Sequence, residues 1–382
     1  MGFGTQGQEV TVAAGGSGAV DFTLVPAAAI LEEVVVTGYG TQRREAITGS
    51  VSTIEADAAN VGVVANVNQM IQGRAAGVEI IQNNGEPGAG AQIRIRGGTS
   101  ISATNEPLYV IDGVPINNRE TEASGFGIGG SPPLPRSPLN LINPSDIQSI
   151  TILKDAAATA IYGSRAANGV VLIETTKGTA NVSTIQYDGY VATATALRHL
   201  QVLNGDQYRA FVQQQVSAGN LTADRLASQG TANTNWEDAV TRRAVTHNHN
   251  LSFSGGSDAT RYRASFNYMN QEGVVLANGL ERVQGRLSGT HHAFSDKLRL
   301  SFNATTSRVN NHYLPYENTG GFEGGVFQNV AVFNPTHPVS VVDQASGVSS
   351  FYEIGTGRQS VRNPVALAEQ IKDYGKTTRT LG

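Results

Sequence analysis

Four of the seven histidines stand in two close pairs, a spacing that could hold a metal ion. His247 and His249 alternate along one predicted strand and so share a face, while His291 and His292 lie on another strand. Neutral imidazole nitrogens are good zinc ligands. The alternative is that these histidines lie at the rim of a β-structure or at an interface, and we favour it. We therefore expect no metal and no other cofactor.

The glycine string at residues 125–130 is a second candidate, because it fits the G-x-G-x-x-G pattern of phosphate-binding loops. In such sites a helix begins directly after the glycines, so that its N-terminus faces the phosphate. Here Ser131, Pro132 and Pro133 follow instead. We interpret the string as an ordinary loop that could face a substrate.

Asp112 and Gly113 form a third candidate. An Asp-Gly pair is typical of a tight turn, in which the carboxylate can bond its own backbone. We find no serine and histidine, and no second carboxylate, placed near Asp112 to support catalysis. We therefore predict that the chain is not an enzyme.

Arg94 and Arg96 alternate with isoleucines just before Gly97, so both arginines should emerge on one face of a strand. There they could line a wall or bind an anionic substrate. Structural ion pairing with carboxylates of a neighbouring wall is the interpretation that we favour.

Composition narrows the fold class and the possible partners. The chain has 382 residues, of which 15% are charged, with 44 glycines and no cysteine. The charged fraction lies well below the roughly 25% of an average soluble protein, and the mixture suits many strands and turns. A net charge of −4 gives no nucleic-acid signature. The absence of cysteine excludes disulfides, thiolate metal sites and cysteine nucleophiles.

The N-terminus shows no visible signal peptide, which leaves two interpretations, a cytoplasmic protein or a missing true N-terminus. No run approaches the ~20 apolar residues of a membrane-spanning helix, and the opening residues MGFGT have neither the basic nor the apolar region of a signal peptide. A new extended segment begins near Thr380, just before the sequence stops. We expect a chain that is truncated at both ends.

The N-terminal residues predict short strands and then a segment for partner binding. Residues 9–12 and 19–24 alternate around a glycine-rich turn, so 1–25 should be the end of a preceding β-domain, since two strands alone make no core. Residues 26–44 should be a linker. Within it, Val34, Val35 and Val36 favour an extended chain with no hairpin partner. An unpaired strand is a template for β-augmentation by another protein, and the alternative is an ordinary edge strand.

Residues 45–178 are predicted to form one mixed α/β domain. Short helices are predicted at 67–72, 144–146 and 156–162, the last stopped by Gly163. Strands are predicted at 78–81, 92–97, 108–116, 150–153 and 169–175. A loop rich in glycine and proline fills 124–138.

From residue 184 the pattern changes to alternating segments of about ten residues, the length and period of transmembrane β-strands. These segments are 184–195, 248–255, 261–270, 283–292 and 297–306. In the third, Tyr262, Phe266 and Tyr268 lie opposite a polar face that carries Arg261 and Arg263. A water-soluble sandwich would alternate in the same way, but the connections here are long and short in turn, which is typical of outer-membrane barrels.

We therefore predict that residues 184–382 form the first five to six strands of a barrel with long extracellular loops. Five or six strands cannot close a membrane barrel, because even the smallest needs about eight. Unpaired strand edges in lipid are prohibitively unfavourable. We expect the native protein to continue past Gly382.

The motifs at this point resemble a known family. Residues 31–40 resemble the coupling segment, or TonB box, of TonB-dependent outer-membrane transporters of the SusC/RagA type. Residues 1–25 resemble the end of the small carboxypeptidase-regulatory-like β-domain that often precedes the plug domain of that family. The segments similar to its plug and early barrel motifs are 73–78 (GRAAGV), 93–97 (IRIRG), 107–116 (PLYVIDGVPI), 141–147 (LINPSDI), 153–169 (LKDAAATAIYGSRAANG) and 363–367 (NPVAL).

The resemblance implies a fold and a function. The fold is an α+β plug domain followed by the N-terminal strands of a transmembrane antiparallel β-barrel that is incomplete in this chain. The function is energy-coupled import of a nutrient, a glycan oligosaccharide or an oligopeptide, across the outer membrane. TonB would pair with the box in the periplasm and remodel the plug, and a surface lipoprotein of the SusD type would cover the barrel mouth.

The resemblance also assigns residues. The expected TonB-binding residues are Glu33, Val34, Val35, Val36, Thr37 and Gly38. The plug-motif residues, structural or substrate-facing, are Arg94, Arg96, Gly97, Asp112 and Gly113. Two alternatives stay open, a siderophore or cobalamin receptor of the same transport class, and an extracellular β-rich adhesin or structural protein that would be soluble without detergent.

Overall fold

A computed structural model describes thirteen stretches of the chain. They are residues 2–3, 26–27, 34–37, 40–43, 50–60, 62–82, 84–97, 105–116, 137–155, 159–313, 325–354, 361–370 and 373–381. The strands predicted at 9–12 and 19–24 lie outside these residues, as does the glycine string at 125–130.

Val34, Val35 and Val36 lie in the first strand of a hairpin. β3 (Val34–Thr37) pairs antiparallel with β4 (Gly40–Arg43), with Thr37 opposite Gly40. The prediction that this strand has no hairpin partner is wrong, because a two-residue connection is the length that joins antiparallel strands most readily. Toward the N-terminus, β1 (Gly2–Phe3) pairs with β2 (Pro26–Ala27). Glu33 and Gly38 lie outside the described residues.

Near-continuous apolar runs build the centre of a five-stranded sheet, which we call the plug sheet. β10 (Ile147–Leu153) and β11 (Val170–Thr175) are almost wholly buried, as expected of central strands covered on both faces. β5 (Val51–Glu55) pairs antiparallel with β10 as an edge strand, and β8 (Leu108–Ile111) pairs parallel with β11. β9 (Val114–Pro115) completes the order β5-β10-β11-β8-β9.

Helices and a hairpin cover this sheet, and together they form the plug domain. On one face the main core gathers side chains from α1 (Ala56–Ala59), α2 (Val67–Ile71) and the hairpin of β6 (Val78–Gln82) with β7 (Ala91–Ile95). The 3₁₀ segment η4 (Ala160–Ala166) packs on the other face. Two further 3₁₀ turns, η2 (Pro138–Leu141) and η3 (Pro144–Asp146), precede β10.

Most predicted elements of this domain are confirmed. The exception is the helix expected at 156–162 with a stop at Gly163. Residues 156–158 lie outside the described residues, and 3₁₀ structure continues beyond Gly163, which adopts φ 70° and kinks the segment. A left-handed glycine can redirect a chain without ending it.

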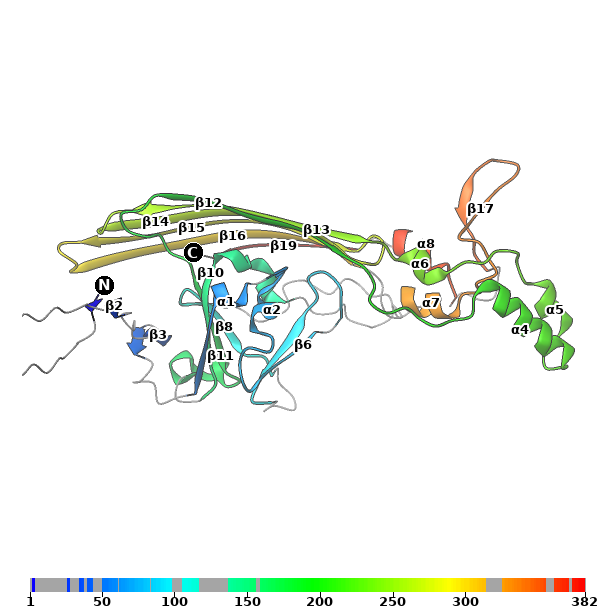
Figure 1. Ribbon diagram of the computed structural model, residues 1–382, viewed down its shortest axis with the longest axis horizontal. Helices are drawn as coiled ribbons and strands as arrows, with labels where there is room; N and C mark the ends of the chain where they lie inside the picture. The colour runs from blue at the N-terminus through cyan, green and yellow to red at the C-terminus, as the bar shows by residue number, and fades with distance from the viewer. Residues whose placement is uncertain are drawn as a thin grey trace, which may run out of the picture.

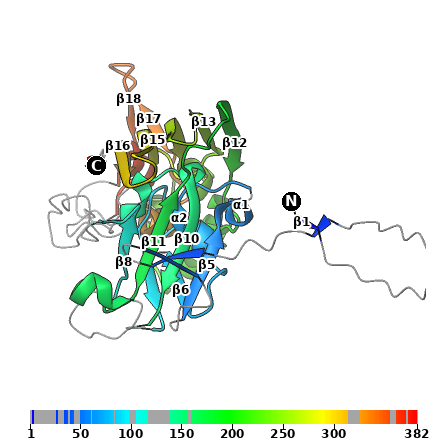
Figure 2. The same cartoon turned by 90° about the vertical axis from the view of Figure 1, so that its left-hand side faces the viewer.

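Alternating residues in the second half of the chain form a six-stranded antiparallel sheet, the barrel sheet. Its strands are β12 (Thr184–Ala194), β13 (Ala244–Gly256), β14 (Thr260–Glu272), β15 (Gly279–Ala293), β16 (Leu298–Tyr313) and β19 (Asp373–Leu381), paired in that order. Figures 1 and 2 show the plug domain packed against one face of this curved sheet.

The polarity of the barrel sheet is reversed relative to a soluble protein. Residues that face the plug domain are polar and buried, among them Asn250 at 0% and Gln284 at 2% exposure. Residues on the outer face are apolar and exposed, among them Phe266 at 53%, Leu287 at 49% and Phe302 at 56%. A wall between lipid and a polar interior requires this arrangement, and a water-soluble sandwich forbids it.

The connections sort by length between the two ends of the sheet. Residues 257–259 and 294–297 make short turns at one end, which we call the short-turn end. The connections 195–243, 273–278 and 314–372 lie at the other, the long-loop end (Figure 1). The predicted alternation of loop lengths is therefore confirmed.

The long connections hold more structure than the sequence indicated. They contain α4 (Gly205–Ser217), α5 (Ala223–Ala227), α6 (Trp236–Val240), α7 (Val326–Val332), α8 (Pro364–Gln370) and the hairpin of β17 (Ser340–Val342) with β18 (Ser349–Phe351). Trp236 packs edge-on against Phe333 in a small apolar core with ring centroids 4.7 Å apart. No helix in the described part of the chain is long and apolar enough to cross a membrane.

The barrel strands also extend beyond their predicted length, since β14 has 13 residues and β16 has 16. The added residues lie toward the long-loop end, where the outer face turns polar. There Asn310 donates to Glu281 at 2.9 Å, and the side chain of Arg308 is exposed. The apolar alternation stops before the strands do, so hydropathy alone underestimated them.

The reversed polarity predicts how a charge on the outer face behaves. Leu287→Arg should destabilise the complete protein in lipid vesicles by roughly 2–4 kcal/mol, because a charge near the middle of a bilayer is strongly disfavoured. Urea unfolding followed by tryptophan fluorescence measures this. The control is Ala259→Arg in a short turn, where the side chain is exposed and the change should be near neutral. Equal effects of the two substitutions would contradict a lipid-facing outer surface.

Candidate functional site at the plug–barrel interface

Asp112 forms a buried ion pair between the plug domain and the barrel sheet. Arg286 of β15 donates to the Asp112 carboxylate at 2.7 Å, and both side chains are almost fully buried, at 4% and 7% exposure. The carboxylate also accepts from the backbone N–H and the hydroxyl of Thr175, at 3.0 and 2.8 Å. Arg286 donates to the Thr175 hydroxyl as well. A buried ion pair held by these extra hydrogen bonds fixes the end of β8 against the wall.

The predicted turn at Asp112 is present, but its carboxylate accepts hydrogen bonds from residues outside the turn. Asp112 and Gly113 both adopt positive φ, 46° and 86°, as in the tight two-residue turn that joins β8 to β9. The carboxylate reaches Thr175 and Arg286 and not its own turn. Its main partner lies 174 residues later in the chain, a separation that local turn chemistry cannot reveal.

Arg282 anchors a second contact. This fully buried guanidinium donates to the backbone carbonyls of Ile142 and Asn140, at 2.9 and 3.3 Å. Asn267 of β14 lies 3.4 Å from it on the same wall. The plug domain thus offers carbonyl oxygens, and no carboxylate, to this cation at hydrogen-bond distance.

A third group of contacts surrounds η3. Asn143 donates to Asn250 of β13 at 3.0 Å, and Gln284 donates to Asp146 at 3.4 Å. Arg263 lies 3.8 Å from the same Asp146 carboxylate. The 3₁₀ turn begins with Pro144 at its first position, and the Asn143 side chain accepts from the N–H of Ser145. Local turn chemistry therefore places both plug side chains toward the wall.

These contacts make the interface polar and hydrogen-bonded. Water can replace such bonds when two surfaces separate, so each contributes only about 0.5–1.5 kcal/mol net. An apolar interface of equal area would resist separation more strongly. The arrangement suits a domain that is held specifically and can still be moved.

Arg94 and Arg96 take different positions from those expected. Arg94 donates to Gln92 of its own strand at 3.2 Å. Arg96 follows the end of β7, adopts φ 57° and forms an ion pair with Asp155 of the plug domain. The expected pairing with carboxylates of the barrel wall is wrong, because the left-handed residue breaks the alternation that would aim both arginines the same way. Gly97 continues this turn at φ 85°.

Asp155 ties the start of the plug sheet to this turn. It accepts from the backbone N–H of Ser50, just before β5, and from Arg96. The Ser50 hydrogen bond and then the Arg96 charge hold the pKa of the Asp155 carboxyl below its usual value. Beside it, Lys154 donates to Ser52 and to the carbonyl of Ala76, each at 2.6 Å. Partial burial, and next the Arg96 charge, lower the pKa of Lys154.

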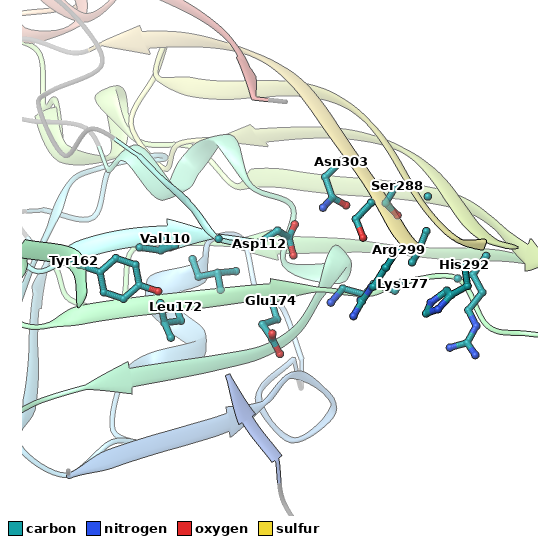
Figure 3. A pocket seen from close by; sticks show the side chains of 17 residues that line it. Val110, Asp112, Tyr162, Leu172, Glu174, Lys177, Ser288, His292, Arg299 and Asn303 are labelled. Carbon is teal, nitrogen blue, oxygen red and sulfur yellow. The ribbon is translucent and has the colours of Figure 1, made fainter. Parts of the chain in front are cut away.

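A cleft of about 480 Å³ opens between β11 and the strands β14 to β16 (Figure 3). Lys177, Arg261 and Arg299 line it, each with an exposed side chain, and Glu174 faces them from the plug domain. Glu174 accepts from Ser149 at 3.2 Å. The cleft carries more positive than negative side chains.

The histidine pairs lie apart from this interface or at its edge. His247 and His249 are on the outer face of β13, where the Tyr187 hydroxyl lies 2.7 Å from His249. His291 contacts Thr260 at 2.7 Å, and His292 contacts Asp296 at 3.0 Å. Within the described residues, no cluster of three or more histidines, aspartates and glutamates could hold a metal ion.

Sequence reasoning missed the barrel-wall residues of the interface. Arg263, Arg282, Arg286 and Asn250 were visible only as members of a polar strand face. A signal was present, because arginines on the face opposite to lipid need buried partners.

The fold and this interface define a class of protein, a plug domain seated against the inner wall of a transmembrane β-barrel, of which this chain holds the first strands. The family model for the TonB-dependent receptor plug domain matches residues 43–170. The chain belongs to the TonB-dependent receptors of the SusC/RagA type, as its motifs indicated.

Relatives support this along nearly the whole chain. It is 39% identical to the TonB-dependent receptor SusC of Bacteroides thetaiotaomicron, with 99% of this chain and 37% of that protein aligned. It is 38% identical to the TonB-dependent receptor P26 of Formosa agariphila, over 81% of this chain and 29% of the relative. The RagAB peptide importer in its open-open state superposes with a TM-score of 0.71 at 27% identity, over 87% of this chain and 38% of that one. The chain therefore spans less than two-fifths of the length of each of these relatives.

The Asp112–Arg286 pair predicts a measurable loosening of the plug. Asp112→Asn keeps the left-handed turn, which asparagine tolerates, but leaves a buried guanidinium without its counter-charge. The urea midpoint for plug unfolding in the complete, detergent-solubilised protein should fall by the equivalent of about 3 kcal/mol. Asp188→Asn on β12 is the matched control, since its exposed carboxylate contacts Gln186 of its own strand. A midpoint that moves no further in Asp112→Asn than in the control would refute the anchoring role.

The depressed pKa of Asp155 predicts that its hydrogen bond from the Ser50 amide depends on pH. Because the folded-state pKa is depressed, its stabilisation is present above the unfolded value of about 3.9 and is lost as pH falls through the lower folded value. Asp155→Ala, which leaves no acceptor for this N–H, should expose the Ser50 amide to hydrogen exchange at pH 7. In the unsubstituted protein that protection should persist at neutral pH and decrease only below about pH 4. Protection that survives the substitution at pH 7 would show that Asp155 does not hold this amide.

Proposed function

We propose that the protein imports a nutrient oligomer, a glycan oligosaccharide or an oligopeptide, across the outer membrane, with energy supplied through TonB. The observation that carries this proposal is the plug domain bound to a polar inner wall while the outer face of the same wall is apolar. An importer needs such a removable seal within a lipid-embedded pore. The similarity to the RagAB peptide importer supports the transport class.

The proposed orientation follows from the loops. Short turns of outer-membrane barrels lie in the periplasm and long loops outside. The short-turn end would then face the periplasm, and β3 lies toward that end (Figure 1). The proposed division of the chain is a preceding β-domain at 1–25, a linker with the TonB box at 26–44, the plug at 45–178 and barrel strands at 184–382.

The TonB-binding residues are proposed to be Glu33, Val34, Val35, Val36, Thr37 and Gly38. β3 belongs to a two-stranded sheet with β4, and no other strand among the described residues pairs with it, which leaves one edge of β3 for a further strand. Backbone hydrogen bonds at such an edge give a strong grip that needs little side-chain chemistry.

Force applied at β3 would reach the plug sheet through β5. Among the described strands, β5 is an edge strand paired with β10 alone, and the Ser50 amide before it is held by Asp155. An edge strand can separate from its sheet without disturbing the others. β5 is therefore the proposed first element to move.

A SusD-type surface lipoprotein is the proposed second partner, at the long-loop end. The helices there leave large apolar side chains exposed, among them Phe211 at 46% and Val332 at 55%. Exposed apolar patches of this kind are typical of interaction surfaces.

The coupling proposal predicts binding of a synthetic peptide of residues 30–41 to the periplasmic domain of TonB. Val35→Pro in that peptide should abolish binding, because proline removes a backbone donor, whereas Val35→Thr should keep it. Isothermal titration calorimetry measures both. In cells, deletion of residues 33–38 from the complete protein should stop uptake while leaving it in the membrane. Equal binding by the two peptides would exclude strand addition, and uptake that survives the deletion would exclude the coupling role.

Two alternatives have distinct outcomes. A siderophore or cobalamin receptor would show coupled uptake of a metal chelate and of no oligomer. An adhesin or structural protein would remain soluble without detergent, whereas the apolar outer face predicts aggregation outside micelles.

A further inference from the structure

The inner face of the barrel sheet carries a regular series of arginines. In an antiparallel sheet, residues directly opposite each other point to the same face. The register therefore assigns every inward residue of β14, β16 and β19 to a level on β15. From Arg282 to His292, each inward level holds one arginine, contributed by one of these strands.

The six arginines, in order from the long-loop end, are Arg282, Arg379, Arg286, Arg263, Arg261 and Arg299. We call this series the arginine track. Successive levels are two residues apart, which corresponds to about 6.6–6.8 Å along a strand. The track thus follows the strands across much of the wall.

Negative charge on the same wall is sparse. At these six levels, β14, β15, β16 and β19 contribute no carboxylate to the inner face. On the neighbouring strands the inner face adds Asp188 of β12 alone. The wall at this height is therefore strongly cationic, although the whole chain has a net charge of −4.

Contacts with the seated plug domain account for only three of the six arginines. Arg286 and Arg263 face Asp112 and Asp146, and Arg282 binds backbone carbonyls. Arg261 and Arg299 instead line the cleft at the short-turn end with exposed side chains. Arg379 lines a separate small cavity beside Asp146. A wall built only to hold the plug would not need the cations in the cleft.

We propose that the arginine track binds anionic groups of the substrate in sequence, so that the imported oligomer is acidic, with carboxylates or sulfates along its length. The inference rests on the proposed import function and specifies its substrate class. Guanidinium groups bind carboxylate and sulfate oxygens through paired hydrogen bonds. Evenly spaced sites let a charged chain pass from one to the next without binding any one too tightly to leave.

The track also explains how plug and substrate exchange. Asp112 and Asp146 occupy track arginines while the plug is seated. As they withdraw, anionic groups of the substrate take the same positions, so the arginines do not remain without a counter-charge. The uncovered Arg261 and Arg299 lie in the cleft, next in line toward the short-turn end.

Cells that express the complete protein test this with a mixture of oligomers of matched length. The mixture contains oligogalacturonates, sulfated galacto-oligosaccharides, malto-oligosaccharides, glutamate-rich peptides and serine-rich peptides, and mass spectrometry follows their depletion from the medium. Only acidic oligomers should be depleted from the medium by a process that is lost when residues 33–38 are deleted. Whether acidic sugars or acidic peptides disappear identifies the substrate class that carries the anionic groups. Coupled depletion of neutral members alone, or of neutral and acidic members equally, would overturn the inference.

Substitutions assign the effect to the track. Arg261→Gln with Arg299→Gln should lower uptake of the acidic oligomer about tenfold, since each removes a charge-assisted contact. Arg308→Gln on the outer face of β16 is the matched control and should leave uptake unchanged. Equal uptake by the double variant and the control would refute the track. If no oligomer is depleted in a way that depends on residues 33–38, the import proposal itself fails, and the substrate inference fails with it.

Discussion

The structure depends on one constraint, which is that the polar inner face of the barrel sheet must find hydrogen-bond partners while it is shielded from water. Lipid on the other side of the sheet requires apolar residues such as Phe266 and Leu287. Strand alternation then places Arg282 and Arg286 inward. The plug domain satisfies these side chains with Asp112, Asp146 and the carbonyls of its 3₁₀ turns.

This constraint explains how the plug can be both specific and removable. Buried ion pairs contribute little net stability, because desolvation offsets much of their attraction, but they strongly disfavour a wrong register. The plug sheet itself has a close-packed apolar core around Ile150 and Ile152. The weak boundary therefore lies between plug and wall, and at the edge strand β5, where Asp155 holds the chain that follows β3 and β4. A pull from that side meets these contacts before it meets the core.

Sequence patterns predicted the elements well where a local rule decides them. The apolar runs of β10 and β11, the Asp-Gly turn after β8 and the sorted loop lengths all follow from residues close in the chain. The site was less predictable, because its contacts join positions far apart. Arg286 and Asp112 carry no mark of each other in the sequence, and the alternation that aimed Arg96 at the wall failed at one left-handed residue. The polarity of the interface was in fact opposite to expectation, with carboxylates on the plug and arginines on the wall.

The central claim is that the plug must separate from the wall for transport, and a reversible cross-link tests it most directly. Asn143 and Asn250 face each other across the interface with their side-chain amides 3.0 Å apart, in a chain that has no cysteine. If separation is required, Asn143→Cys with Asn250→Cys should block uptake when oxidised and restore it on reduction, while TonB binding stays unchanged in both states. Full uptake by the oxidised, cross-linked protein would contradict it.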